Sequence, residues 1–146
     1  MTQDNAMTPS TNAALASAID ELAEYCYVTS SRNGFHADDE LITSILADCG
    51  DCSPYEQARK WYIATTEQAE IARMHSELSE GLESVRKDPD RPDQHLPQFS
   101  NRTVEYADTI IRILDTCAKR GLPIGDALIA KMAYNASRPY KHGKNS

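Results

Sequence analysis

Apolar residues recur at helical spacing along almost the whole of this chain, and strand patterns are nearly absent. This spacing predicts helices over about residues 11–29, 38–48, 53–86, 102–120 and 124–136. The third begins most clearly, because Pro54 fits a first helical position and Glu56 can complete a capping box with Ser53. Helices with apolar stripes bury them by packing on one another, so we predict an all-α bundle of four main helices and one short helix.

Length and composition indicate one domain. The chain has 146 residues, of which 40% are hydrophobic and 25% charged, enough for a single core but not for two. We expect a disordered polar leader at residues 1–12 and one helical domain over residues 13–146. The apolar runs are too short to span a membrane, and the polar start MTQDNAMTPSTN lacks the features of a signal peptide. These features predict a cytoplasmic protein without membrane contact.

The net charge of −7 is unevenly distributed. Residues 1–100 carry 18 acidic and 7 basic side chains, a net charge of −11, whereas residues 101–146 carry 4 acidic and 8 basic side chains, a net charge of +4. An acidic protein lacks the large basic face that general nucleic-acid binding requires, so nucleic acid is not an expected partner. The basic end suits a small polyanion such as the phosphates of a nucleotide, although a solubilising tail explains its composition equally well.

Two carboxylate pairs lie within predicted helices, Glu77-x-x-Glu80 and Glu105-x-x-Asp108. Residues three apart are neighbours on a helix surface, so each pair can present two carboxylates to one point. Four clustered carboxylates repel one another unless a cation lies among them, and a hard divalent metal such as Mg²⁺ prefers oxygen ligands. By spacing alone, a solvated acidic helix face is the more common explanation.

The last predicted helix and the residues after it carry groups that can bind phosphate. Lys131 and Asn135 are four residues apart and share a helix face, and Arg138, Tyr140 and His142 follow. Lysine and arginine bind phosphate strongly, and asparagine can donate a neutral hydrogen bond. The alternative is a helix end whose basic residues only complement the helix macrodipole.

Three blocks of the sequence match one family. The stretches HSELSEGLESVR (residues 75–86) and VEYADTIIRILD (residues 104–115) resemble the two metal-binding helices of MazG-like nucleoside triphosphate pyrophosphohydrolases. The stretch KMAYNASRPYKHGK (residues 131–144) is similar to the C-terminal signature of small phage and bacterial members. The family pattern is E-E-x-x-E followed by E-x-x-D, and this chain has Ser76 in place of the first glutamate.

The resemblance implies an all-α fold that assembles as a homodimer or homotetramer. It also implies an enzyme that uses Mg²⁺, or Mn²⁺ in its place, to cleave a nucleoside triphosphate into a monophosphate and pyrophosphate. The positions that match the family's metal ligands are Glu77, Glu80, Glu105 and Asp108. The positions that match its substrate contacts are Lys131 and Asn135, with Arg138, Tyr140 and His142 closing the site. Glu80 is the candidate general base, because it need not be fully committed to metal.

Ser76 is the one departure from the family's acidic motif. Glu67 and Glu70 lie upstream on the same predicted helix and could compensate for the missing carboxylate. Two other functions remain open. The first is a non-catalytic helical interaction module that keeps the fold without the activity, and the second is metal-dependent hydrolysis of a different phosphate ester.

Overall fold

The computed structural model describes residues 8–48 and 53–138. The helices are α1 (Pro9–Arg32), α2 (Ala37–Asp48), α3 (Ser53–Lys87), α4 (Asn101–Lys119) and α5 (Ile124–Ala136). Within the described residues the only extended pairing is an isolated bridge between Pro92 and Ser100. The prediction of an all-α chain is confirmed, and each predicted helix appears within three residues of its expected bounds.

The first helix begins earlier than the sequence pattern predicted. Residues 9–12, which we assigned to a disordered leader, form the first turn of α1. Thr8 caps this turn, because its side chain accepts a hydrogen bond from the backbone N–H of Thr11 at 3.2 Å. Pro9 then takes a first-turn position, where its missing N–H has no cost. Capping therefore moves the start of the helix ahead of its first apolar residue.

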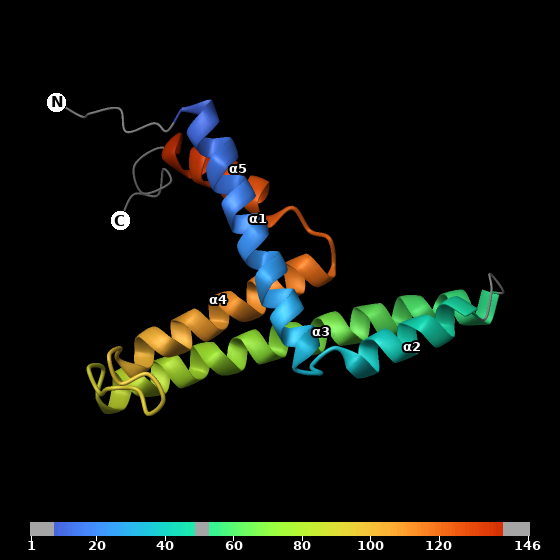
Figure 1. Ribbon diagram of the computed structural model, residues 1–146, viewed down its shortest axis with the longest axis horizontal. Coiled ribbons are helices and arrows are strands. Elements are labelled where there is room, and N and C mark those ends of the chain that lie inside the picture. Colours follow the sequence, from blue (N-terminus) through green and yellow to red (C-terminus); the bar gives the residue numbers. More distant parts are fainter. Residues whose placement is uncertain (1–7, 49–52, 139–146) are drawn as a thin grey trace.

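The helices form two arms rather than a closed bundle (Figure 1). In the first arm α3 and α4 lie side by side as a hairpin, and α2 lies along the opposite half of α3. In the second arm α1 packs against α5, and α1 also crosses the C-terminal half of α4 where the arms meet. None of the helices in the described ranges combines the length and apolar character that a membrane span requires.

The core is small and lies where the two arms meet. Ala23 and Cys26 of α1 pack against Leu114 of α4, with partly buried apolar side chains around them. Leu78 and Leu82 belong to the apolar stripe of α3, but they are 47% and 51% exposed, so the described residues do not bury this stripe. The reason is that α4 covers only one side of this part of α3, so much of the stripe has no neighbour among residues 8–48 and 53–138.

A partly buried ionic network ties α2 and α3 to the end of α4. Glu70 of α3 lies 2.8 Å from the ammonium of Lys119 and 2.7 Å from the guanidinium of Arg120. Lys119 also pairs with Asp39 of α2, which accepts a hydrogen bond from the Tyr62 hydroxyl. Burial and this hydrogen bond raise the pKa of Tyr62 to about 12. The network fixes the middle of α3 against α4 and so sets the register of the hairpin.

Gly125 lies at the closest approach of α1 and α5. Its backbone N–H donates to Asp20 at 2.8 Å, and a β-carbon at this position would lie 2.2 Å from the carbonyl oxygen of Ala16. Gly125→Ala should therefore force the two helices apart and lower the free energy of unfolding by about 1–3 kcal/mol, measured by urea denaturation. Ala127→Ser on the exposed side of α5 is the control, and equal stability of both variants would contradict the close contact.

Candidate metal centre

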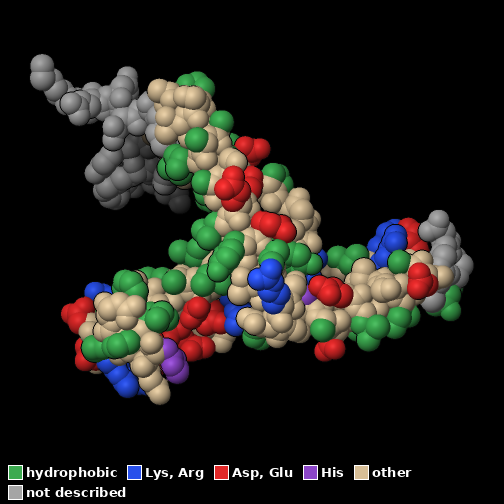
Figure 2. Space-filling view, in the orientation of Figure 1, with side chains coloured by type: hydrophobic (Ala, Val, Ile, Leu, Met, Phe, Trp, Pro, Cys, Tyr) green, Lys and Arg blue, Asp and Glu red, His purple; other side chains and the backbone are tan. Residues whose placement is uncertain are grey.

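The two acidic motifs meet on the α3–α4 hairpin. Gly81 allows close packing there, because a β-carbon at this position would lie 3.2 Å from the ring of Tyr106 and 3.5 Å from the β-carbon of Glu105. One carboxylate oxygen from each of Glu77, Glu80 and Glu105 lies within 4.8 Å of the others. The predicted convergence of the two helices is therefore present for these three side chains. Figure 2 shows acidic side chains on this arm among exposed hydrophobic ones.

Asp108 adjoins this group without belonging to it. Burial raises the pKa of Asp108, and the negative charge of Glu77 raises it further, while Arg112 opposes the shift. Burial likewise raises the pKa of Glu105; Asn101, which donates to it at 2.8 Å, opposes the shift, and the charges of Glu80 and the other acids add to it. Ionised carboxylates held this close favour a bound cation, because a cation removes their mutual repulsion.

Arg112 is a site residue that the sequence analysis missed. Its Nε atom donates to a carboxylate oxygen of Glu77 at 3.0 Å. The signal was available within α4, because Arg112 lies four residues after Asp108 and seven after Glu105 and so shares their helix face. The ion pair orients the Glu77 carboxylate toward α4.

The three converging carboxylates fit a hard divalent cation. Mg²⁺ binds oxygen at about 2.0–2.1 Å, so two oxygens on one ion lie up to about 4.2 Å apart. The observed spacing of up to 4.8 Å exceeds this value by a fraction of an ångström, which a small rotation of the exposed Glu80 side chain can reduce. Among the described residues the Glu80 side chain makes no hydrogen bond or ion pair, so its oxygens are available.

The two carboxylates considered as replacements for the missing glutamate, Glu67 and Glu70, lie elsewhere. Glu70 is held by Lys119 and Arg120 in the ionic network, and Glu67 lies 3.7 Å from Arg120. Neither side chain is among the three converging acids. Ser76 itself is exposed on α3. The site therefore has no replacement for the first glutamate of the family pattern among these residues.

The predicted phosphate-binding residues lie on the other arm. Lys131, Asn135 and Arg138 are exposed at the C-terminal end of α5, which packs against α1. Figure 1 shows this end far along the second arm, away from the α3–α4 hairpin. The Lys131 ammonium and the Arg138 guanidinium lie 4.9 Å and 5.8 Å from the centre of the Tyr134 ring. One chain thus does not bring these residues to the carboxylates.

Two of the predicted substrate contacts, Tyr140 and His142, lie outside the described residues. Their expected role in closing the site stays a prediction.

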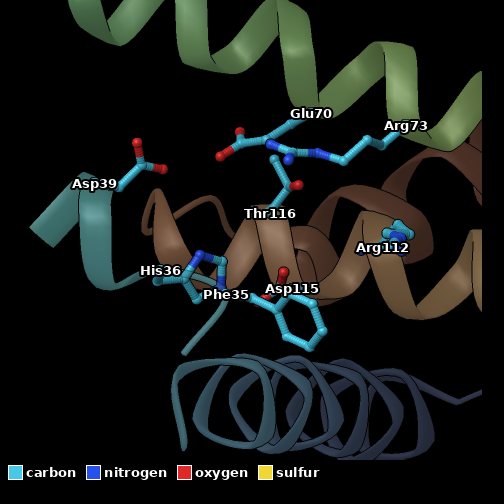
Figure 3. Close-up of a pocket in the computed structure, with 8 residues that line it drawn as sticks. All are labelled: Phe35, His36, Asp39, Glu70, Arg73, Arg112, Asp115 and Thr116. Atoms are coloured by element: carbon cyan, nitrogen blue, oxygen red, sulfur yellow. The ribbon is translucent and has the colours of Figure 1, made fainter. Parts of the chain in front are cut away.

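A small cavity of about 40 Å³ lies between the metal centre and the ionic network (Figure 3). Glu70 and Arg73 of α3 lie on one side of it and Asp115 of α4 on the other. Asp115 lies 2.8 Å from the ring nitrogen of the buried His36. This volume holds only about three water molecules, so the cavity cannot enclose a nucleobase, and its polar groups are most simply part of the packing.

Comparison of the chain with protein-family models, with curated proteins and with solved structures finds no match. The geometry of the α3–α4 hairpin and the motifs of the sequence are therefore the observations from which a function can be inferred.

Proposed function

We propose that this protein is a MazG-like enzyme that hydrolyses a nucleoside triphosphate to the monophosphate and pyrophosphate with Mg²⁺, or Mn²⁺ in its place. The observation that carries the proposal is the convergence of Glu77, Glu80 and Glu105 within 4.8 Å from two different helices. The resemblance of the three sequence blocks supplies the substrate class, which the carboxylates alone do not specify.

The residues of the hairpin have separable roles in this reaction. Glu77, Glu80 and Glu105 would hold Mg²⁺, with Asp108 next to them. Bound Mg²⁺ neutralises phosphate charge and lowers the pKa of a coordinated water. Arg112 keeps Glu77 oriented through the 3.0 Å ion pair.

Glu80 is the general base of the proposed reaction. It is exposed, and it has no partner among the described residues. In the hydrolysis, water attacks in line at the linkage between the α- and β-phosphorus, and a water proton passes to Glu80. The water oxygen bonds to one of these two phosphorus atoms, the bond from that phosphorus to the bridging oxygen breaks, and the bridging oxygen stays with the other phosphorus, so that monophosphate and pyrophosphate separate.

The proposed enzyme is a homo-oligomer, a dimer or a tetramer. Around the carboxylates Leu78, Leu82, Tyr106 and Ile110 are each about half exposed, and burying apolar surface contributes about 25 cal/mol per Å². A second copy that covers this face would also exclude water from the acids. If the face is covered by the second arm of that copy, the basic end of α5 meets the acidic hairpin, which joins opposite charges and completes the site with Lys131, Asn135 and Arg138.

Pyrophosphate release from a panel of canonical and modified nucleoside triphosphates tests the function. We expect release with Mg²⁺ and none with chelator. Activity that is indifferent to chelator would contradict the proposal, and orthophosphate release from simple esters would favour the ester hydrolase. A folded protein that is inactive on the whole panel would favour the interaction module, which the serine at position 76 supports.

A further inference from the structure

Helix α2 has little cover among the described residues. None of its 12 residues is buried, and the helix that it lies along is α3. Isolated helices shorter than about 12–15 residues are marginal in water, and most helical stability in proteins comes from packing of an apolar face. In α2 the apolar side chains are exposed instead, with Leu41 at 60% and Ile45 at 53%. Another surface is therefore needed to cover this helix.

The apolar residues of α2 share one side of the α2–α3 pair with the single tryptophan of the chain. Asp39 and Tyr62 mark the contact between the two helices, because the Tyr62 hydroxyl donates to Asp39. Each residue turns a helix by about 100°, so Ile42 and Ile45 are turned back from Asp39 by about 60° and 120°. Trp61, which is 70% exposed, is turned back from Tyr62 by about 100°. Because α2 and α3 run antiparallel, these turns lead to the same side of the pair. The outer face defined in this way consists of Leu41, Ile42, Ile45 and Trp61.

The outer face is separate from the apolar residues around the metal centre. Those residues, the hairpin face, are Leu78, Leu82, Tyr106 and Ile110. Trp61 precedes Leu78 by 17 residues, which places the two about 25 Å apart along α3 and about 100° apart around it. A copy that packs on the hairpin face therefore approaches α3 from a different side and leaves the outer face open.

The accessible surface of the chain is large enough for more than one contact. It measures 11049 Å², whereas a compact monomer of 16.2 kDa exposes about 7,500 Å². The excess is about 3,600 Å², and it would still be about 1,300 Å² if residues 1–7, 49–52 and 139–146 had the surface of a fully unfolded chain. A stable interface buries about 800 Å² of each partner. The excess thus exceeds what a single interface would cover.

We propose that the outer face packs against a further copy of this chain, so that the assembly is a tetramer, built as a dimer of dimers. This inference rests on the homo-oligomer of the proposed function and names its size. Tryptophan is enriched among the residues that dominate binding energy, and the interfaces of homodimers are more apolar than the rest of a protein surface. Closed assemblies of four identical copies use more than one kind of contact, which matches the two separate faces.

Light scattering after size-exclusion chromatography of the full-length protein tests the inference. Wild type should have the mass of four copies. Ile45→Glu should halve the mass, because it places an unpaired charge within the outer face. Leu82→Glu in the hairpin face should also halve it, and the double variant should be a monomer. Ser44→Glu is the matched control, because Ser44 is exposed next to Ile45 but is turned by about 100° from it; this variant should keep four copies.

The fluorescence of Trp61 reports the same contact without a substitution. Trp61 is the only tryptophan, so its emission should shift to longer wavelength as dilution separates the tetramer into dimers that expose the outer face. Ile45→Glu should show the emission of the dimer at every concentration, with unchanged far-ultraviolet circular dichroism because this side chain is already half exposed.

The outcomes separate this inference from the proposed function. A wild type of one or two copies overturns the inference, and so does an equal loss of mass in the Ile45→Glu and Ser44→Glu variants. A tetramer that hydrolyses no triphosphate supports the outer face as an interface and contradicts the enzyme. An active dimer contradicts the inference and supports the enzyme.

Discussion

Glu105→Gln should lower kcat/KM for pyrophosphate release by about 10²–10³-fold, the scale expected when one group that stabilises transition-state charge is removed. The amide keeps the size of the side chain and its contact with Asn101, but it loses the charge that a hard cation requires. Glu77→Gln should have a similar effect and should also leave Arg112 without its anionic partner. The measurement is the rate at increasing Mg²⁺ concentration for each purified variant.

Stability distinguishes a lost metal ligand from a damaged fold. The pKa of Glu105 is raised in the folded protein, chiefly by burial, so its ionised form destabilises the fold at pH values above the unfolded pKa. Without metal, the Glu105→Gln variant should therefore be at least as stable as wild type at neutral pH. Glu56→Gln, an exposed change at the start of α3, should keep full activity. Equal loss of activity in the Glu105→Gln and Glu56→Gln variants would contradict the assignment of the metal site.

Glu70→Ala should lower the free energy of unfolding by about 3–5 kcal/mol, the range for removing one partner of a buried ion pair. Glu70 is 7% exposed and contacts both Lys119 and Arg120, so its removal leaves two cations poorly compensated. Chemical denaturation monitored by circular dichroism would measure the loss.

Glu67→Ala is the control for this change. Glu67 lies one turn before Glu70, its side chain is half exposed, and it reaches Arg120 only at 3.7 Å. Its removal should cost less than about 1 kcal/mol. Equal losses for the two variants would mean that the network does not hold the middle of the hairpin.

The helices themselves were predictable because their signals are local. The apolar spacing in residues 102–120 and the Gly121 break identify α4 from a few neighbouring residues, and the spacing within each acidic motif places its two carboxylates on one face. Contacts between helices were not predictable in this way, because they depend on how the helices pair. The Arg112–Glu77 ion pair requires α3 and α4 to lie in one particular register, and no pattern within either helix specifies that register.

The apolar stripes show a second limit of sequence reasoning. Periodicity identified the apolar face of α3 through Leu78 and Leu82, but it does not say whether the same chain covers that face. Periodicity likewise does not predict which helix α5 packs against, because an apolar face through Leu128 and Met132 fits any apolar partner. In this fold α5 packs on α1, which separates Lys131 and Asn135 from the acids within one copy.

Because α1 packs against α4 and α5, the fold can be completed only after both of these helices have been synthesised. The α3–α4 hairpin closes across the short loop of residues 88–100, so it can form as soon as α4 has emerged, with little loss of chain entropy. The first helix must wait for the last two, about 90 residues later. At ordinary rates of translation this delay is on the order of 5–20 s. For that time the apolar side of α1 lacks its contacts with α4 and α5, and a chaperone that binds exposed helices would find it the first available target.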